Sequence, residues 1–371
     1  MCTGAVVCGN LGTESTTTFG IDARAAAEVP AGRGRYVREL ISALADDGEG
    51  DRYRLYARRP DRTDLPRDRF AWELSGLRDP LWHAQTAARA GRTTQAFLST
   101  NSYLTAWATT VPTAVVIYDL VPFVSPEEAQ QRAARIERIT IRPALCRADA
   151  LLCISEATRR DLVRLFPHTS DRACVIPLAA DAALAGPVEP ALLDKPYVLA
   201  VGTLEPRKNL IRLIEAFAQL PASVRDSHQL ALVGPAGWDL DGTLRAACAR
   251  PEDVTVLGYV DDQRLHALYA GAACFAYPSL YEGFGLPVLE AMTAGTPVVT
   301  SSVSSLPEVA GDAALLTDPT DVRAIRDALA AVLEDPSRAR SMGEAGRARS
   351  RAFSWARTAA ATRDVLRELA R

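Results

Sequence analysis

The stretch that decides the fold is YEGFGLPVLEAMTAGTPVVTSS, residues 281–302. The apolar run ACFAYPS lies before it and the apolar run TPVVTS lies near its end, so the pattern indicates strand, loop, helix and strand in that order. Pro287 suits the first helical position, because an N–H there would have no partner inside the helix. Gly295 then ends the helix, since glycine tolerates the backbone conformation found at helix C-termini.

The loop in this stretch consists of Gly283, Phe284, Gly285 and Leu286. Its backbone N–H groups lie at a helix N-terminus beside the carboxyl end of a strand, an arrangement that binds anions or sugar hydroxyls. We expect Glu290 in the first helical turn, where the helix dipole favours a carboxylate, and Glu282 just before the loop, aimed at whatever the amides hold. An ordinary strand–helix turn, with glycines for tightness and glutamates placed for the dipole, would show the same residues.

Strands and helices alternate along the whole chain, which is typical of parallel α/β folds. The expected strands of the first half are TFGIDA (18–23), AFLST (96–100), TAVVIYDL (113–120) and ADALLCIS (148–155). Segment 177–196 carries four prolines and no period, and after it the pattern restarts with YVLAVGT. We therefore predict two doubly wound α/β domains that face a central cleft, because open parallel sheets bind ligands at the carboxyl ends of their strands.

Length and composition fit this organisation. The 371 residues exceed the ~250–300 that one hydrophobic core usually serves. A net charge of −3 gives no basic excess for nucleic acid or an anionic membrane, and we interpret the arginine-dense segment 52–69 as a solvated face. The seven cysteines are scattered, without a Cys-x-x-Cys pair, which favours a reducing cytoplasm over a disulfide framework or a zinc site.

Five segments together resemble the family-4 retaining glycosyltransferases, which have the glycosyltransferase-B fold of two Rossmann-like domains. EGFGLPVLE is similar to the Glu-x7-Glu motif of that family. The other four segments are VGTLEPRKNL (201–210) at the start of the donor domain, GRGRYVREL (32–40) at the first Gly-rich loop, SEATRRDLVR (155–164) in a mid-chain helix and FSWARTA (353–359) in a C-terminal crossover helix. The resemblance covers residues 18 to 371, and the segments follow the order found in the family.

The resemblance implies a division of the chain into four parts. Residues 1–17 lack the basic flank and the long apolar run of a signal peptide, and we expect them to form a loose N-terminal extension. Residues 18–180 form the acceptor-side domain, and residues 181–352 form the domain that binds the sugar nucleotide. Residues 353–371 form a helix that crosses back to the first domain.

The resemblance also assigns roles in the second domain. Arg207 and Lys208, near Gly202, match the diphosphate-binding pair of the family, where fixed cations would stabilise the charge that develops on the leaving group. Glu290 corresponds to the residue that binds the ribose hydroxyls, and Glu282 with the amides of the loop corresponds to the groups that hold the transferred sugar. Taken alone, the Arg-Lys pair would also fit an ordinary solvated basic turn.

The same resemblance implies that no metal and no other cofactor is needed, because these cations take the place of a metal. The Asp-Leu-Asp sequence of residues 239–241 imitates a metal-binding Asp-x-Asp, and we interpret it as turn chemistry. Gly32 and Gly34 belong to the Gly-rich loop of the first domain.

The end of the strand TAVVI departs from the family pattern. The family has His-Asp there, with the histidine contacting the transferred sugar near its O6, whereas this chain has Tyr118 and Asp119. We expect the Tyr118 hydroxyl to reach the transferred sugar and Asp119 to lie as a carboxylate beside the acceptor. Both join the two cations and Glu282 as candidate catalytic residues. A core aromatic at Tyr118 would fit the apolar residues before it equally well.

The implied function is a retaining glycosyltransferase that moves a hexose from a nucleotide-diphosphate sugar to a hydroxyl of a glycan, lipid-linked or small-molecule acceptor. The chain looks most like bacterial mannosyltransferases that build surface polysaccharide, so GDP-mannose is the first expected donor and a UDP-hexose the second. We expect a cytoplasmic protein without a nucleic-acid partner, in peripheral contact with the inner membrane face if the acceptor is lipid-linked.

Other classes of protein share parts of this pattern. A sugar-nucleotide 2-epimerase has the same fold and diphosphate site, and a catalytically silent partner protein could bind nucleotide without turning it over. A retaining glycosidase also uses two carboxylates, about 5–5.5 Å apart, but the Arg-Lys loop would have no role in its mechanism. The products formed from a sugar nucleotide, with and without an acceptor, separate these classes.

Overall fold

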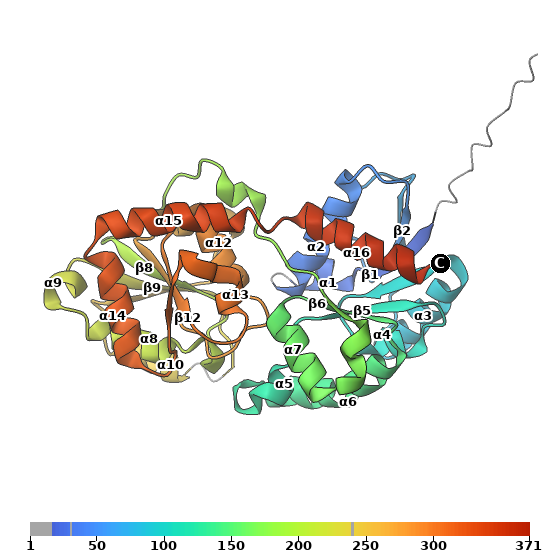
Figure 1. Cartoon of the computed structure of the whole chain (residues 1–371), viewed down its shortest axis with the longest axis horizontal. Coiled ribbons are helices and arrows are strands. Elements are labelled where there is room, and N and C mark those ends of the chain that lie inside the picture. The colour runs from blue at the N-terminus through green and yellow to red at the C-terminus, as the bar shows by residue number, and fades with distance from the viewer. Residues whose placement is uncertain (1–16, 30–31, 239–240) are drawn as a thin grey trace, which may run out of the picture.

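The computed structural model describes residues 17–29, 32–238 and 241–371, and it contains two β-sheets (Figure 1). The strands of the first sheet are β1 (Thr18–Asp22), β2 (Arg52–Ala57), β3 (Phe70–Leu74), β4 (Ala96–Ser99), β5 (Thr113–Ile117), β6 (Ala150–Cys153) and β7 (Ala173–Val175). The strands of the second sheet are β8 (Tyr197–Val201), β9 (Gln229–Val233), β10 (Val254–Gly258), β11 (Cys274–Tyr277), β12 (Val298–Ser301) and β13 (Leu315–Thr317).

The strand order is that of two doubly wound sheets. The first sheet runs β3-β2-β1-β4-β5-β6-β7 and the second runs β10-β9-β8-β11-β12-β13. All neighbouring strands pair in parallel, and in each sheet the chain first winds outward on one side of β1 or β8 and then on the other. The predicted α/β fold of two doubly wound domains is confirmed.

Helices connect the strands in both domains. The helices of the first domain are α1 (Arg24–Glu28), α2 (Arg33–Asp46), α3 (Leu81–Thr93), α4 (Tyr103–Ala108), α5 (Val121–Val124), α6 (Gln131–Arg147) and α7 (Glu156–Leu165). The later helices are α8 (Leu210–Ala218), α9 (Ala222–Arg225), α10 (Asp241–Cys248), α11 (Asp262–Gly271), α12 (Leu286–Ala294), α13 (Leu306–Ala310), α14 (Val322–Leu333), α15 (Pro336–Ser350) and α16 (Trp355–Leu369). Short 3-10 turns are η1 (Pro126–Glu128), η2 (Pro167–Arg172), η3 (Ala182–Ala185), η4 (Pro206–Lys208) and η5 (Gly311–Ala313).

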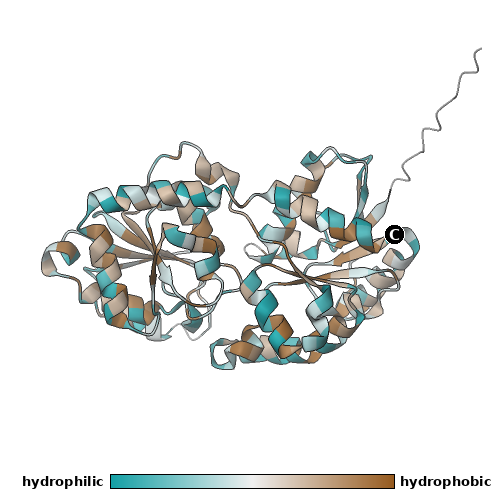
Figure 2. Ribbon diagram, viewed as in Figure 1, coloured by the Kyte–Doolittle hydropathy of each residue, from teal (hydrophilic) through white to brown (hydrophobic). Residues whose placement is uncertain are grey.

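Both faces of each sheet are buried, because successive residues of a strand point to opposite sides. In β5, Val116 packs with the residues of α2, whereas Val115 and Ile117 pack with α4 and α6. In β8, Leu199 packs with α11 and α12, whereas Val198 packs with α8 and α14. Figure 2 shows the result as apolar strands inside each domain, covered by helices with polar outer faces.

The last helix joins the two domains. α15 lies on the second domain and α16 returns across the first, where it packs against α2 (Figure 1). Its Thr358 hydroxyl donates to the carbonyl of Pro177 at 2.7 Å, and Arg363 forms an ion pair with Asp47 of the first domain at 2.5 Å. The first domain is therefore completed by residues from the far end of the chain.

One sequence interpretation is wrong in part. Segment 52–69, read as a solvated basic face, begins with the strand β2, in which Tyr53, Leu55 and Tyr56 are buried. Its arginine side chains are exposed or half-buried, as expected. The alternation of arginine with large apolar residues is the strand signal, and the density of positive charge conceals it.

The ends of the predicted domains are partly visible. The first sheet ends at Val175 and the second begins at Tyr197, and the segment between them contains only the turn η3. Residues 1–16 of the predicted N-terminal extension lie outside the described residues.

Candidate active site at the domain boundary

The loop after β8 presents the two predicted phosphate-binding cations. Gly202 follows β8 with φ of 149°, a backbone conformation that other residues rarely adopt, and a Cβ there would lie 3.3 Å from Cε of Lys208. Arg207 and Lys208 lie in the turn η4 immediately before α8. The glycine thus leaves space for the lysine stem to run back toward the end of the strand.

Both cations contact the predicted sugar-binding carboxylate, Glu282. Lys208 Nζ donates to Glu282 Oε1 at 2.6 Å, and Arg207 Nη1 donates to Glu282 Oε2 at 2.8 Å. Arg207 also pairs with Glu205 at 2.5 Å, and Lys208 also donates to the Tyr277 hydroxyl at 2.6 Å. The alternative interpretation, an ordinary solvated basic turn, is therefore wrong, because Lys208 and Glu282 are buried and in contact.

The charges of this cluster fix its protonation. Although burial opposes ionisation, Arg207 and Lys208 lower the pKa of Glu282 from its usual 4.5 to about 2. Burial and the neighbouring Arg207 lower the pKa of Lys208. An ammonium has three donors and a guanidinium five, so both cations keep N–H groups beyond those used here. Those remaining donors suit the oxygens of a diphosphate.

The loop of the opening stretch lies next to this cluster. Within the described chain, the backbone N–H groups of Gly283, Phe284 and Gly285 donate to no protein acceptor. Gly285 caps α12 with φ of 101°, and α12 begins at Leu286, so Pro287 is its second residue and not the first. Phe284 is buried and its ring meets that of Phe353 edge-on at 5.8 Å. The loop offers unpaired amides at the N-terminus of a helix, as predicted.

The first domain closes directly on this loop. A Cβ at Gly283 would lie 1.9 Å from the carbonyl oxygen of Tyr118, so only glycine permits the contact. The Gly283 carbonyl accepts hydrogen bonds from Ser155 Oγ at 2.6 Å and from Thr158 Oγ1 at 3.1 Å. These two hydroxyls belong to the N-terminal turn of α7, where Ser155 is also the N-cap.

Glu308 extends the same contact. Its two carboxylate oxygens accept hydrogen bonds from the N–H groups of Glu156 at 2.9 Å and Ala157 at 3.2 Å. A carboxylate of the second domain therefore satisfies the first amides of a first-domain helix, where the helix dipole is positive. The SEATRRDLVR segment is therefore the part of the first domain that forms hydrogen bonds with the Gly283 loop of the second domain.

Glu290 lies elsewhere than predicted. It is the fifth residue of α12 and so belongs to the second helical turn, which means that the helix dipole does not account for its position. Its carboxylate instead accepts a hydrogen bond from the Tyr269 hydroxyl at 2.8 Å and forms an ion pair with Arg35 of α2. Burial raises the pKa of Glu290 while Arg35 opposes that rise. Arg35 also pairs with Asp262 at 2.8 Å, so it bridges the two domains.

Tyr118 and Asp119 follow β5 at the boundary. Tyr118 is buried, its ring meets Tyr36 edge-on at 5.6 Å, and its hydroxyl has no hydrogen-bond partner among the described residues. Asp119 Oδ1 accepts from the N–H of Val121 at 3.3 Å. A cavity of about 220 Å³ lies beside Asp119 and reaches Arg207 and Glu205 of the second domain. The cavity places Asp119 across from Arg207, one of the two predicted diphosphate-binding cations.

The Gly-rich loop of the first domain is compact. Gly32 caps α2 with φ of 54°, and a Cβ at Gly34 would lie 1.7 Å from the carbonyl oxygen of Val29. Residues 30 and 31 lie outside the described residues. The glycines therefore set the start of α2, which delivers Arg33 and Arg35 to the boundary. Sequence reasoning missed both arginines, although they stand between and beside the two glycines that it selected.

No group of three or more histidine, cysteine or acidic residues suited to hold a metal ion occurs in the part of the chain that the structure describes. The Asp-Leu-Asp sequence falls mostly outside that part: residues 239 and 240 are not described, and residue 241 begins α10. Among the described helices, none is long and apolar enough to cross a membrane.

Two sequence models of known families match the chain in tandem. The model named Glycosyltransferase Family 4 matches residues 30–184, and the model named Glycosyl transferases group 1 matches residues 187–349. An O-antigen chain mannosyltransferase B of Escherichia coli is 36% identical over 298 residues, covering 77% of this chain and 74% of the relative. The chain belongs to the family-4 glycosyltransferases.

One further sequence relative and one solved structure are also similar to this chain. The serotype-specific mannosyltransferase WbdA of Escherichia coli is 32% identical over 266 residues, which cover 67% of this glycosyltransferase and 32% of WbdA. The structure of a sucrose-phosphate synthase from Thermosynechococcus elongatus superposes with a TM-score of 0.73 at 24% identity, covering 95% of this chain and 99% of that one. The glycosyltransferase-B fold predicted from the sequence is confirmed.

Proposed function

We propose that this glycosyltransferase moves mannose from GDP-mannose to an acceptor hydroxyl with retention of configuration and without a metal. The observation that carries the proposal is the cluster of Arg207, Lys208 and Glu282, which lies beside the unpaired amides of the loop that begins at Gly283. The relatedness to a mannosyltransferase over three quarters of the chain supports the choice of sugar. UDP-hexoses are the second donor class.

The chemistry requires one bond to form and one to break. The acceptor oxygen bonds to the anomeric carbon of the donor, the bond from that carbon to the diphosphate oxygen breaks, and the departing oxygen takes the proton of the acceptor hydroxyl. Negative charge grows on the diphosphate, where the spare N–H groups of Arg207 and Lys208 stabilise it. Glu290 would hold the ribose, and Glu282 with the loop amides would hold the sugar.

The protonation of the carboxylates argues against a retaining glycosidase. That mechanism needs one carboxylic acid with a raised pKa to protonate the leaving group and one carboxylate as nucleophile. Arg207 and Lys208 hold the pKa of Glu282 near 2, and the oxygens of Glu290 already face Arg35 and Tyr269. The two cations, in contrast, suit a diphosphate leaving group.

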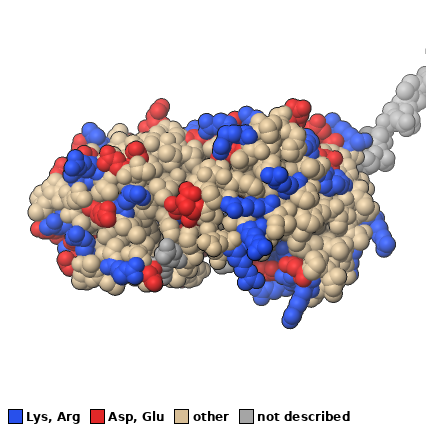
Figure 3. All heavy atoms as spheres, turned by 90° about the horizontal axis from the view of Figure 1, so that it is seen from below, with Lys and Arg blue, Asp and Glu red and all other residues tan. Residues whose placement is uncertain are grey.

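The acceptor would be a glycan, a lipid-linked sugar or a small molecule, and a lipid-linked acceptor would bring the enzyme to a membrane surface. Exposed arginines line α6 and α7 (132, 135, 138, 142, 160 and 164). The face seen in Figure 3 includes basic groups gathered over the first domain, and on the second domain basic and acidic groups are mixed. We propose this face of the first domain for such contact with anionic headgroups.

A donor panel tests the proposal. GDP-mannose, GDP-fucose, UDP-glucose and UDP-galactose are each added to the protein, and the melting temperature and the products are measured with and without a mannoside acceptor. A ligand at 100 times its dissociation constant adds ~2.7 kcal/mol of stability. We expect GDP-mannose to stabilise most and to give an α-linked product in the presence of a chelator. Formation of an epimerised sugar nucleotide, or binding without any product, would favour the two alternative classes.

A further inference from the structure

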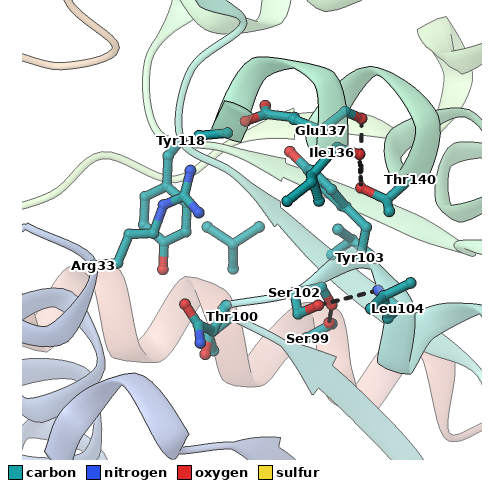
Figure 4. A pocket seen from close by; sticks show the side chains of 14 residues that line it. Arg33, Ser99, Thr100, Ser102, Tyr103, Leu104, Tyr118, Ile136, Glu137 and Thr140 are labelled. Atoms are coloured by element: carbon teal, nitrogen blue, oxygen red, sulfur yellow. Dashed lines mark hydrogen bonds between the residues drawn. The ribbon is translucent and has the colours of Figure 1, made fainter. Parts of the chain in front are cut away.

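A cavity of the first domain lies beside Tyr118 and has a volume of about 280 Å³ (Figure 4). It is formed by the carboxyl ends of β4 and β5, by the start of α2 and by α4 and α6, so every lining residue comes from the first domain. Its polar lining includes Arg33, Asn101, Ser102, Tyr103, Tyr118 and Glu137. We call it the Arg33–Glu137 pocket.

Three polar groups of this pocket lack the partners that buried polar groups normally have. Within the described chain, Glu137 Oε1 and the Tyr118 hydroxyl are buried without a hydrogen bond. Arg33 lies with its guanidinium carbon 5.1 Å from the centre of the Tyr118 ring, and no hydrogen bond or ion pair joins it to a described residue. Figure 4 shows Arg33 beside the Tyr118 ring, with Glu137 reaching toward them from α6.

Burying such groups without hydrogen-bond partners lowers the free energy of unfolding, so these residues destabilise the fold as long as no ligand is bound. Burial and the nearby carboxylate of Asp119 raise the pKa of Glu137 to about 7, and Arg33 only partly opposes that rise. A glutamine or a leucine at this position would avoid the cost, yet the chain keeps a carboxyl group. A ligand that supplies hydroxyl donors to Glu137 and acceptors to Arg33 would remove the cost.

The position of the pocket relates it to the reaction. Ala133 and Glu137 line both this pocket and the cavity of about 220 Å³ that reaches Arg207. A molecule held in the pocket would therefore adjoin the cavity that Arg207 lines, and it would lie on the side of the first domain. The donor, in contrast, is placed by residues of the second domain.

We propose that the Arg33–Glu137 pocket binds the terminal sugar of the acceptor as a neutral ring, whose hydroxyls bond to Glu137, Arg33 and the Tyr118 hydroxyl. This inference rests on the proposed function, and it adds the chemical class and the contact residues of the acceptor. A volume just below the ~300–1,000 Å³ of typical ligand pockets fits one sugar unit, with the rest of the acceptor outside.

The charges favour a neutral sugar over a phosphorylated one. Arg33 alone would attract a phosphate, but Glu137 and Asp119 lie near it and contribute two carboxyl groups. An anion in this pocket would meet Glu137 in the lining and the electrostatic field of the nearby Asp119, and both carboxylates repel negative charge. Sugar hydroxyls can donate to a carboxylate and accept from a guanidinium at the same time.

The test measures binding of methyl α-mannoside, methyl α-glucoside and inorganic phosphate to the full chain by saturation-transfer NMR. Each probe is examined with the donor site empty and with GDP present in excess. The variants are Glu137→Gln and Arg33→Gln, with Glu127→Gln and Arg67→Gln as matched controls, because those two residues are exposed on the same domain. Melting temperatures show that each variant is folded.

We expect at least one neutral glycoside to bind in the presence of GDP, and both pocket variants to weaken that binding about tenfold or more, as for loss of a charged hydrogen bond. The controls should bind as the wild type does. With an acceptor that is turned over, Glu137→Gln should raise the KM for acceptor much more than the KM for donor.

Three results would overturn the inference. They are competition between glycoside and GDP, phosphate binding that Arg33→Gln abolishes, and glycoside binding that is the same in Glu137→Gln and Glu127→Gln. Failure of the proposed function is distinguishable, because a protein that does not turn over GDP-mannose would still bind the glycoside through Glu137 if the pocket is a sugar site.

Discussion

Two charged regions face each other across the domain boundary, and they differ in how their charges are matched. In the second domain, Arg207 and Lys208 lie against Glu282, and each of these side chains has named partners at 2.5–2.9 Å. In the first domain, Arg33 and Glu137 line one pocket, and neither side chain is hydrogen-bonded within the described chain.

The difference concerns when each site is assembled. The matched cluster is held in place before any ligand arrives, which is what stabilisation of a developing charge requires, because fixed donors need no reorganisation during the reaction. The unmatched pair is an incomplete site that lacks its hydrogen-bonding partner. The first arrangement suits chemistry and the second suits recognition of a substrate.

The matched cluster can be broken most directly at its cations. Replacing Arg207 or Lys208 by alanine should lower the rate of transfer by about two orders of magnitude or more, because a fixed donor to the leaving group is lost. Each variant should also melt at a lower temperature, since the buried Glu282 carboxylate loses a cation. Steady-state rates at saturating donor, taken well below the melting temperature, measure the effect. Wild-type turnover in both variants would remove the diphosphate site.

The two glutamates of the opening stretch should fail in different ways. Glu282→Gln should chiefly lower kcat, because Glu282 contacts both cations and, in the proposed function, would also hold the sugar that moves. Glu290→Gln should chiefly raise the Kd for nucleotide, since ribose is bound alike before and during the reaction. Isothermal titration with GDP and kinetics with GDP-mannose separate these effects. If the two variants bind and react equally well, only the helix-turn interpretation of the stretch survives.

A variant of Tyr118, which lies at the domain boundary, tests which sugar the tyrosine hydroxyl contacts. If the transferred sugar has a hydroxyl at C6, Tyr118→Phe should lower turnover by an amount equivalent to about 1–3 kcal/mol, because one buried polar contact is lost. If the Tyr118 hydroxyl contacts only the donor sugar, the variant should react with a 6-deoxy donor as the wild type does, whereas a contact with the acceptor sugar in the Arg33–Glu137 pocket would lower turnover with both donors. Its melting temperature should not fall, since the hydroxyl has no protein partner in the described chain. Paired 6-hydroxy and 6-deoxy donors provide the comparison, with Asp119→Asn expected to lose activity on both.

The smallest expected effect is a pH dependence of stability that differs between the two regions. The pKa of Glu137 is raised to about 7, so its ionisation costs stability as pH rises from 4.5 to 7, and Glu137→Gln should melt higher than wild type at pH 8 but not at pH 4. The pKa of Glu282 is lowered to about 2, so its stabilisation is present above pH 4.5 and is lost as pH falls toward 2. Glu282→Gln should therefore melt lower than wild type at pH 7. Melting curves that shift in the same direction for both variants at pH 7–8 would contradict the contrast.

Sequence reasoning reached the second region and not the first for a physical reason. The strand, loop and helix around Gly283, and the loop that carries Arg207, are local patterns whose glycines and charges stand close together in the chain. The pocket forms only when Arg33, Tyr118 and Glu137 meet through packing of α2, β5 and α6. Glu137 stands in a helix rich in arginine, where a glutamate usually indicates a solvated face.

The contact of Arg35 with Glu290 joins residues 255 positions apart, and no local pattern encodes it. The fold was more accessible, because the alternation of apolar runs and helical periods repeats in every α/β unit. Sequence reasoning missed several strands, among them β2, β3 and β7; in β2, arginines alternate with buried tyrosine and leucine and imitate a polar segment.

The hydrogen bonds of the Gly283 carbonyl couple the position of its loop to the contact between the two domains. The carbonyl of this loop, whose amides we propose for donor binding, accepts hydrogen bonds from Ser155 and Thr158 at the start of α7. Glu308 of the second domain accepts hydrogen bonds from the first amides of the same helix. Parting the two domains therefore breaks these hydrogen bonds together and releases the loop from one side. A closing movement that forms these hydrogen bonds would also fix the proposed donor-binding loop, so closure and assembly of that site would be a single step. The turnover rate would then depend on the contacts at the start of α7 as well as on the residues that contact the sugar.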